Sequence, residues 1–112
     1  MSKVCDLGNK QCKPCEGGTP ALSQSEIDRL LSQLEDWQQH EQTISKTYTF
    51  KNYYQTIAFV NALAWMTHRE NHHPDLTVTY NSCRVAYSTH AIGGLSENDF
   101  ICAAKADALF KL

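Results

Sequence analysis

Apolar residues recur at helical spacing in residues 23–34. Ser23 and Glu26 stand three positions apart, which is the spacing of a capping box at a helix start. The pattern predicts an amphipathic helix that ends near Asp36 and Trp37. Its apolar stripe consists of Ile27, Leu30, Leu31 and Leu34.

Alternation of apolar and polar residues follows this helix. In residues 37–41 and 43–50 the apolar side chains of Ile44, Tyr48 and Phe50 share one parity. Side chains of a strand point to opposite faces in turn, so this parity indicates one buried face. The two segments therefore predict a pair of strands.

The longest apolar segment is residues 57–66. Asn52 is a good N-cap residue and Pro74 cannot continue a helix, so we expect a helix from Asn52 to about Glu70. Its middle is apolar almost all the way round and must be covered on at least two sides. In so short a chain we expect another subunit to provide the second cover.

Alternation returns in residues 76–80 and 83–89, which predict a second hairpin with a tight turn at residues 81–82. A last helix is predicted from Ser96, whose spacing to Asp99 again resembles a capping box. The predicted order is α-β-β-α-β-β-α. Such an order is typical of an α+β fold, here a four-stranded antiparallel sheet covered on one face by helices.

The length of 112 residues fits one domain, which we place at 22–112 after a leader of 1–21. A formal charge of −2 provides no basic field for nucleic acid, so direct binding to DNA or RNA is disfavoured. The chain shows no signal peptide and no apolar run of the roughly 18–20 residues that a membrane span needs. We therefore expect a cytoplasmic protein without membrane association.

The leader contains Cys5, Cys12 and Cys15, and the last two form a C-x-x-C motif. A zinc site would need four ligands, and no second pair of ligands is nearby. A redox C-x-x-C usually opens a helix after a strand, which the leader does not offer. We expect an extended or mobile leader with reducible thiols.

Four of the five histidines fall in one stretch, at positions 68, 72, 73 and 90. About seven residues out and seven back at ~3.3 Å per residue bring His90 to the level of His73 at one end of the sheet. Histidine titrates near neutral pH, so two histidines at one rim could give a proton to a leaving group and take another from a neighbouring atom. The pattern indicates an elimination or isomerisation.

Other interpretations of these residues stay open. His68 and His72 are spaced as zinc ligands on a helix, but Glu70 does not occupy the base position of the metalloprotease motif, so we expect no metal. Asp99 could cap the last helix or contact a substrate, and Tyr80 could belong to the core or to a binding site.

The residues His72-His73-Pro74, Tyr80, Ser88-Thr89-His90 and Gly94-Leu95-Ser96-Glu97 with Asp99 resemble the pterin-4a-carbinolamine dehydratases over roughly residues 22–112. The resemblance implies subunits that pair their edge strands in a homodimer or homotetramer. It implies dehydration of 4a-hydroxytetrahydrobiopterin, the product of aromatic amino acid hydroxylases, to quinonoid dihydropterin. The pterin is then the substrate, and no cofactor is expected.

Carried over by position, the resemblance assigns acid/base roles to His72 and His90 and a third active-site role to His73. It places Asp99 near the pterin, and we expect substrate contacts from His68, Tyr80, Ser88 and Thr89 as well. The best-known members often carry Glu where this chain has His68. Because that Glu helps to orient the first histidine, the sequence leaves open which side chain orients His72.

Three rival functions are compatible with the sequence. The first is a protein-binding module, since mammalian relatives also act as a dimerisation cofactor of a transcription factor. The second is a dehydratase-like protein of molybdopterin metabolism. The third is a zinc-binding module that uses His68, His72 and cysteines of the leader.

Overall fold

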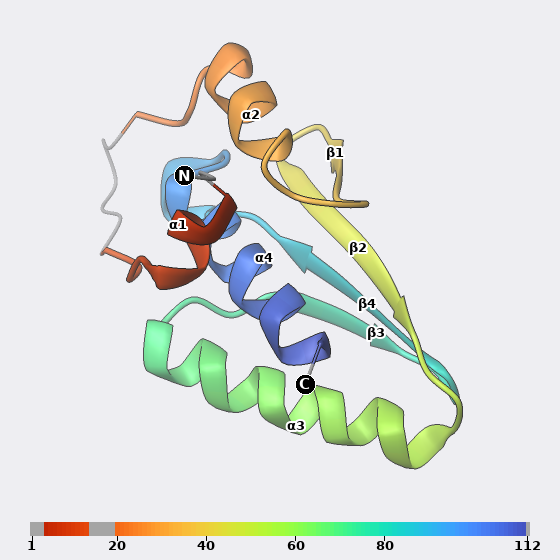
Figure 1. Ribbon diagram of the computed structural model, residues 1–112. Coiled ribbons are helices and arrows are strands. Elements are labelled where there is room, and N and C mark those ends of the chain that lie inside the picture. Colours follow the sequence, from red (N-terminus) through yellow and green to blue (C-terminus); the bar gives the residue numbers. More distant parts are fainter. Residues whose placement is uncertain (1–3, 14–19, 112) are drawn as a thin grey trace.

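A computed structural model describes residues 4–13 and 20–111 of the chain (Figure 1). The predicted α+β fold is confirmed, with a four-stranded antiparallel sheet in the order β1-β2-β4-β3 and helices packed on one face. The elements are α1 (Val4–Asn9), α2 (Gln24–Leu31), β1 (Gln38–His40), β2 (Thr43–Thr49), α3 (Tyr53–Glu70), β3 (Asp75–Val78), β4 (Ser82–Tyr87), the 3-10 turn η1 (His90–Ile92) and α4 (Glu97–Phe110).

Helix α2 begins where the sequence predicts. The Ser23 backbone N–H donates to Glu26 Oε1 at 2.9 Å, and the Ser23 hydroxyl accepts from the Glu26 backbone N–H at 3.3 Å. Ile27 and Leu30 are buried, but α2 ends at Leu31, one turn earlier than the apolar stripe predicts. The capping box therefore defines the start of the helix better than periodicity defines its end.

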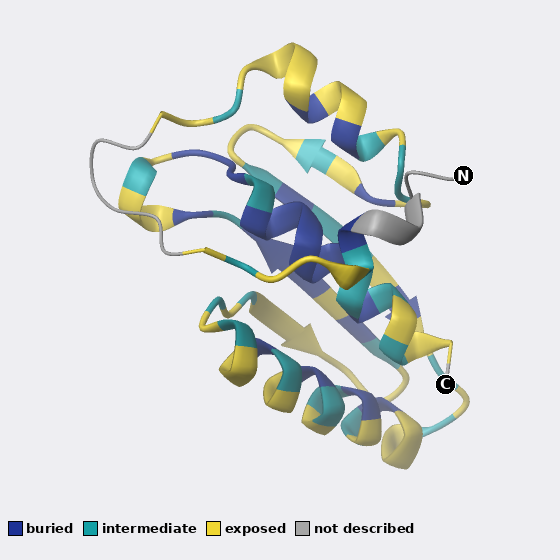
Figure 2. Ribbon diagram, turned by 60° about the vertical axis from the view of Figure 1, so that its left-hand side comes forward, coloured by how far each residue is buried: buried dark blue, intermediate teal, exposed yellow. Residues whose placement is uncertain are grey.

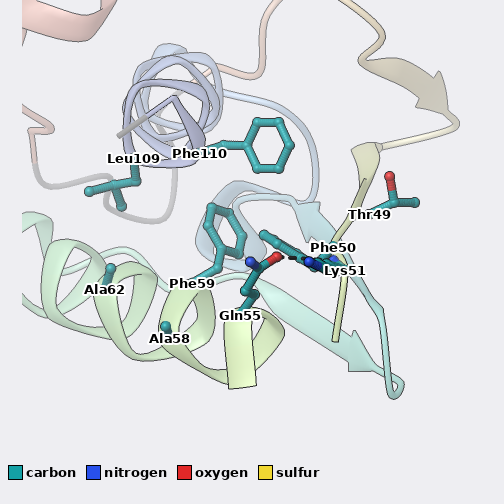
Figure 3. Close-up of a pocket in the computed structure, with 9 residues that line it drawn as sticks. All are labelled: Thr49, Phe50, Lys51, Gln55, Ala58, Phe59, Ala62, Leu109 and Phe110. Atoms are coloured by element: carbon teal, nitrogen blue, oxygen red, sulfur yellow. Dashed lines mark hydrogen bonds between the residues drawn. The ribbon is translucent and has the colours of Figure 1, made fainter. Parts of the chain in front are cut away.

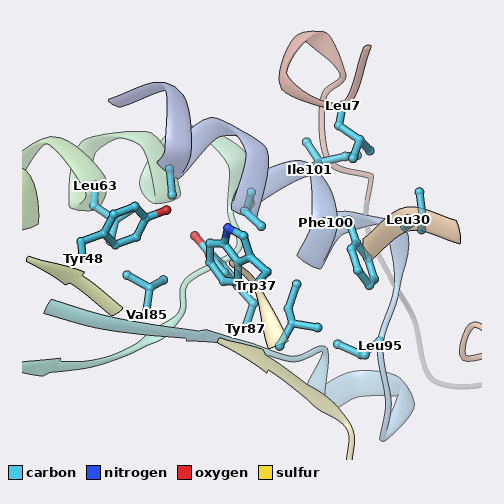
Figure 4. Packing of buried hydrophobic residues seen from close by; sticks show 14 of the residues in the cluster. Leu7, Leu30, Trp37, Tyr48, Leu63, Val85, Tyr87, Leu95, Phe100 and Ile101 are labelled. Carbon is cyan, nitrogen blue, oxygen red and sulfur yellow. The ribbon is translucent and has the colours of Figure 1, made fainter. Parts of the chain in front are cut away.

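The core lies between the inner face of the sheet and the helices. Ile44 and Tyr48 of β2, and Val85 and Tyr87 of β4, are almost completely buried, and Ile44 stands opposite Tyr87 in the ladder. Figure 4 shows Tyr48, Val85 and Tyr87 between the strands and α4, which contributes Phe100 to the same core. Burial of large apolar side chains stabilises the fold by roughly 1.5–3 kcal/mol for each.

Helix α3 covers the sheet with a single stripe. Other large side chains of α3 are exposed to solvent, and the exposed positions recur along the helix (Figure 2). Tyr54 is 82% exposed and Trp65 is 66% exposed. A second cover from another subunit therefore stays a prediction. The buried stripe of α3 consists of Thr56, Phe59, Leu63 and Thr67.

The tight turn of the second hairpin lies one residue earlier than the sequence indicates. The Thr79 backbone N–H donates to the Ser82 carbonyl at 2.9 Å, so Tyr80 and Asn81 form the turn. The Thr79 and Ser82 hydroxyls are also hydrogen-bonded, at 2.6 Å. Tyr80 is therefore at the tip of the hairpin and 65% exposed.

The N-terminal segment differs from the expected extended arm where the structure describes it. Residues Val4–Asn9 form α1, and Leu7 is 2% exposed in the core beside α4. Lys105 Nζ donates to the Gly8 carbonyl at 3.0 Å. The buried Leu7 and this bond are two of the contacts that hold a segment whose polar composition indicated an arm. Cys15 lies outside the described residues, and the boundary at residue 21 stays a prediction.

Replacing Asp107 with asparagine should lower the free energy of unfolding by about 3 kcal/mol. Its partly buried carboxylate accepts from Trp37 Nε1 at 3.2 Å, Lys46 Nζ at 2.9 Å and the Tyr48 hydroxyl at 2.6 Å, which joins α4 to the sheet. Burial and the Asp107 carboxylate raise the pKa of Tyr48. Urea unfolding measures the loss, and Asp28→Asn on the exposed face of α2 should change stability by less than about 0.5 kcal/mol. A loss no larger than that of Asp28→Asn would contradict the assignment.

Candidate active site

His72 is positioned by the way α3 ends. Asn71, directly after the helix, has a left-handed backbone with φ of 54°, a conformation that asparagine tolerates better than most residues. The His72 backbone N–H still reaches back to the Thr67 carbonyl at 3.2 Å. The turn at Asn71 thus directs the chain out of the helix, and His72 is the first residue beyond it.

The His72 ring is held by a buried carboxylate. Its Nε2 lies 2.6 Å from Asp99 Oδ1, and the Asp99 side chain is completely buried. Asp99 Oδ2 accepts from the Thr89 hydroxyl at 2.8 Å and from the Ser96 backbone N–H at 3.0 Å. Because an ionised carboxylate only accepts, His72 Nε2 carries the proton in this pair. Nδ1 is then the ring nitrogen left for chemistry.

Asp99 has two tasks in the structure. It completes the capping box of α4 with Ser96, as the spacing predicts, and the same carboxylate oxygen that caps the helix accepts from Thr89. The orienting group for His72 is therefore Asp99, from the far end of the chain.

The His72 ring also packs against an aromatic side chain. The rings of His72 and Tyr87 are stacked, with centroids 5.4 Å apart and planes at 13°. The Tyr87 hydroxyl is buried and has no hydrogen-bond partner among the described residues, and burial raises the pKa of Tyr87. Tyr87 therefore acts as a neutral platform that restricts the imidazole.

The pKa of His72 is raised above its usual value. Burial acts to lower the pKa, but the hydrogen bond from the ring to Asp99 and the negative charge of Asp99 outweigh it, and Cys102 adds to the increase. A larger fraction of His72 is therefore protonated at neutral pH than of an ordinary histidine.

This pKa shift makes stability depend on pH. A group with a raised pKa in the folded state stabilises the fold fully below its unfolded pKa, about 6.5 for histidine, and loses this contribution as the pH rises through the folded pKa. We expect the free energy of unfolding to fall as the pH rises from about 6 through neutrality, and we expect His72→Gln to remove this component. Urea unfolding at several pH values measures it. An equal slope in both proteins would contradict the shift.

His72 lies in the wall of a cavity of about 470 Å³. The exposed His73 lines it from the same side, and Ser88, Thr89 and His90 line it from the segment after β4. The structure thus brings together the three histidines that the sequence singles out as catalytic. A volume of this size is within the range of small-molecule sites.

The loop that carries His90 is closed on itself. The Thr89 backbone N–H donates to the Gly94 carbonyl at 3.0 Å, and the Gly94 N–H returns to the Thr89 carbonyl at 3.4 Å. Gly93 makes the reversal with φ of 63°, in the left-handed region that favours glycine. His90 starts η1 within this loop, so its backbone is fixed although its side chain is exposed.

Three predicted substrate contacts lie outside the cavity wall. His68 is exposed on α3, with its ring centroid 6.4 Å from that of Trp65. Tyr80 is at the hairpin tip, and Asp99 is behind His72 rather than in the wall. Substrate contacts from His68 and Tyr80 therefore stay predictions.

The N-terminal segment adds a wall that the sequence did not predict. The Cys12 backbone N–H donates to Glu70 Oε1 at 2.9 Å. The Asn98 amide group accepts from the Lys13 N–H at 3.0 Å and donates to the Lys13 carbonyl at 2.6 Å. All four residues line the cavity. These pairs are 58 and 85 positions apart in sequence, so no local pattern could have revealed them.

A second cavity, of about 580 Å³, lies at the other end of α3 (Figure 3). The close-up shows the rings of Phe50, Phe59 and Phe110 around it. Among the described residues that line it, Lys51 is the only charged one, and none of them is a histidine or a carboxylate. The histidine-lined cavity is therefore the candidate active site.

Among residues 4–13 and 20–111, no group of three or more His, Cys, Asp and Glu side chains is placed to hold a metal ion. Within the same residues, no helix combines the length and the apolar character needed to cross a membrane.

Fold and cavity together define a small α+β domain with a histidine-lined pocket. Residues 20–109 match the family model described as pterin 4 alpha carbinolamine dehydratase, so the chain belongs to this family. A relative from Nitrosomonas europaea is 65% identical over 99% of both chains, and one from Nitrosospira multiformis is 66% identical over 97% of this chain and 96% of the relative. Both carry the name pterin-4-alpha-carbinolamine dehydratase provisionally.

Two solved structures are similar to this one. A protein from Brucella melitensis, described as a transcriptional coactivator/pterin dehydratase, has a TM-score of 0.77 at 28% identity and covers 80% of this chain and 97% of its own. A pterin dehydratase-like protein described as a RuBisCO assembly factor of the alpha-carboxysome has a TM-score of 0.56 at 27% identity and covers 65% of this chain and 84% of its own.

Proposed function

We propose that this protein dehydrates 4a-hydroxytetrahydrobiopterin to quinonoid dihydropterin by histidine acid/base catalysis. The observation that carries the proposal is the His72–Asp99 pair in the wall of a cavity that also presents His73 and His90. Such a pair supplies a proton at a fixed position, and the neighbouring imidazoles can accept one. The membership of the family supports the pterin as substrate.

In the proposed reaction His72 is the general acid. Its raised pKa increases the protonated fraction of the ring, and in that form Nε2–H is bonded to Asp99 while Nδ1–H is directed to the substrate hydroxyl. The C4a–O bond breaks as Nδ1 gives its proton to the leaving hydroxyl, and water is released. The substrate's N5 loses its proton to His90 or His73, and the N5 electron pair forms the C4a=N5 double bond.

The proposed reaction balances without any other reactant. One proton leaves His72 and one arrives at the base, and solvent returns both histidines to their starting states. The reaction therefore needs no cofactor. We further propose that its substrate comes from aromatic amino acid hydroxylases, so that the protein recycles their pterin in the cytoplasm.

The test is a dehydration assay in which an aromatic amino acid hydroxylase generates the 4a-hydroxypterin in place. The protein is treated with chelator throughout, and His72→Ala and His90→Ala are compared with the wild type. His40→Ala is the matched control, because His40 is an exposed histidine on β1, outside the cavity wall. We expect turnover well above the spontaneous rate, retained in His40→Ala and lost in the other two variants. A wild-type rate equal to the spontaneous rate would contradict the proposal.

A protein-binding role is the second candidate, and the exposed aromatic face of α3 favours it. Tyr53, Tyr54 and Trp65 are 47%, 82% and 66% exposed, and a binding surface would cover such side chains. We propose first that a second copy of this chain covers them, as a homodimer or homotetramer. Trp65→Glu should then lower the molecular mass in sedimentation equilibrium to that of a smaller assembly. An unchanged mass would contradict this interface.

A further inference from the structure

The N-terminal segment brings two cysteines together beside the pocket. Cys12 Sγ, on the segment after α1, lies 3.5 Å from Cys102 Sγ on α4, although the residues are 90 positions apart. Cys102 is completely buried, whereas Cys12 is half-buried and lines the cavity. We propose that Cys12 and Cys102 are a redox modification site, where a reversible disulfide fastens the N-terminal segment to the wall of the pocket.

The surrounding contacts hold the two sulfurs in place. Glu70 and Asn98 bind the backbone of Cys12 and Lys13 on either side of the thiol, so the segment cannot slide along α4. Cys12 Sγ also lies 3.7 Å from the Asn98 carbonyl. A disulfide needs the sulfurs about 2.05 Å apart, so the two sulfurs have to approach by about 1.5 Å.

The electrostatics of the pair favour reaction. The hydrogen bond between the two thiols, in which either sulfur can be the donor, lowers the pKa of Cys102, and the positive charge of His72 acts in the same direction against the effect of burial. The hydrogen bond to Cys102 and burial raise the pKa of Cys12. The pair therefore loses one proton more readily than a buried thiol alone. The two sulfurs lie 3.5 Å apart, so the remaining proton can pass to Cys102, and the half-buried Cys12 is then the thiolate that acts as the nucleophile.

The oxidant in the proposal is a peroxide, which reaches Cys12 from the cavity. The thiolate attacks one peroxide oxygen, the S–O bond forms, the O–O bond breaks and hydroxide leaves. The second sulfur then attacks the sulfenic sulfur, the S–S bond forms and the second oxygen leaves as hydroxide. The two thiol protons convert both hydroxides to water. The sulfurs lose two electrons, the peroxide gains two, and a dithiol reductant reverses the change.

The disulfide would change the N-terminal segment from a wall held by hydrogen bonds to one held covalently. The linkage closes a long loop, so it should raise the midpoint of thermal unfolding by about 5 °C or more. A pterin in the cavity should cover the accessible side of Cys12 and slow the oxidation. This last effect rests on the proposed function, whereas the disulfide itself does not.

The test treats the reduced full-length protein with hydrogen peroxide, blocks remaining thiols and maps linked peptides by mass spectrometry. Cys12→Ser and Cys102→Ala remove the pair, and Cys83→Ala is the control, since Cys83 is a buried cysteine of β4 away from the cavity. We expect a Cys12–Cys102 linkage and a higher unfolding midpoint in the wild type and in Cys83→Ala. Neither should occur in the other two variants.

The outcomes separate the two proposals. A linkage of Cys12 to Cys15, or no linkage at all, would overturn the Cys12–Cys102 site. If the linkage forms and a dihydropterin added in excess slows its formation several-fold, the thiol pair and the pterin pocket both stand. If it forms at the same rate with and without dihydropterin, the disulfide stands and the pterin in this cavity does not.

Discussion

Replacing His72 with glutamine should reduce kcat/KM for the dehydration by roughly 10²–10⁴-fold, the usual range for the loss of a general acid. Glutamine keeps a polar side chain of similar length, and its amide can still donate to Asp99, but it cannot transfer a proton at neutral pH. The fall should therefore appear in kcat more than in KM. Steady-state kinetics with the hydroxylase-coupled assay measure both.

The control for this prediction is His73, the neighbouring histidine in the same wall of the cavity. His73→Gln changes an exposed histidine whose ring Nδ1 lies 3.3 Å from the Pro74 carbonyl oxygen. If His73 serves in binding, this variant should raise KM with a smaller effect on kcat. A His72→Gln variant that retained the wild-type kcat would overturn the assignment of His72.

Replacing Asp99 with asparagine should have the second largest effect, on stability and on pH dependence together. The fully buried carboxylate accepts from His72, Thr89 and the Ser96 backbone, and asparagine presents donors where one of these needs an acceptor. We expect a loss of about 3 kcal/mol in the free energy of unfolding. The variant also removes the charge that raises the pKa of His72.

The direction of the pH effect follows from the role of His72. If the protonated ring is the active form, kcat/KM falls as the pH rises through the His72 pKa, and a lower pKa moves this alkaline limb to lower pH. Asp107→Asn provides the matched control, because it weakens a partly buried carboxylate on the same helix but outside the cavity wall. It should lose comparable stability without moving the limb. An unmoved limb in Asp99→Asn would contradict the role of Asp99.

Local patterns predicted the elements because their causes are local. The capping pairs at Ser23 and Ser96 join residues three positions apart, and the alternation in β2 and β4 reflects one buried face. The predicted position of the hairpin turn was wrong by one residue, because Tyr80 continues the apolar parity of β3 into the turn. Side-chain alternation alone cannot distinguish a last strand residue from a first turn residue.

Contacts between residues far apart in the sequence could not be predicted from local patterns. The N-terminal segment forms part of the cavity wall because Cys12 and Lys13 bind Glu70 and Asn98. No sequence motif or regular spacing indicates that Glu70 and Asn98 are these partners. The assignment of Asp99 as the partner of His72 likewise needed the fold, since α4 returns to the end of α3 only in three dimensions. The sequence did predict that His73 and His90 lie close together, because the hairpin between them runs out and back over about the same number of residues.

The capping carboxylate of α4 has a consequence for the motions of the protein. Since Asp99 binds both the first turn of α4 and the imidazole of His72, unwinding that turn and releasing the ring are one opening event. The amide hydrogens of Ser96 and Asp99 should therefore exchange with solvent at a rate that follows the charge of His72, slower when the ring is protonated. Hydrogen exchange at the start of a helix thus reports the state of a side chain that belongs to another segment.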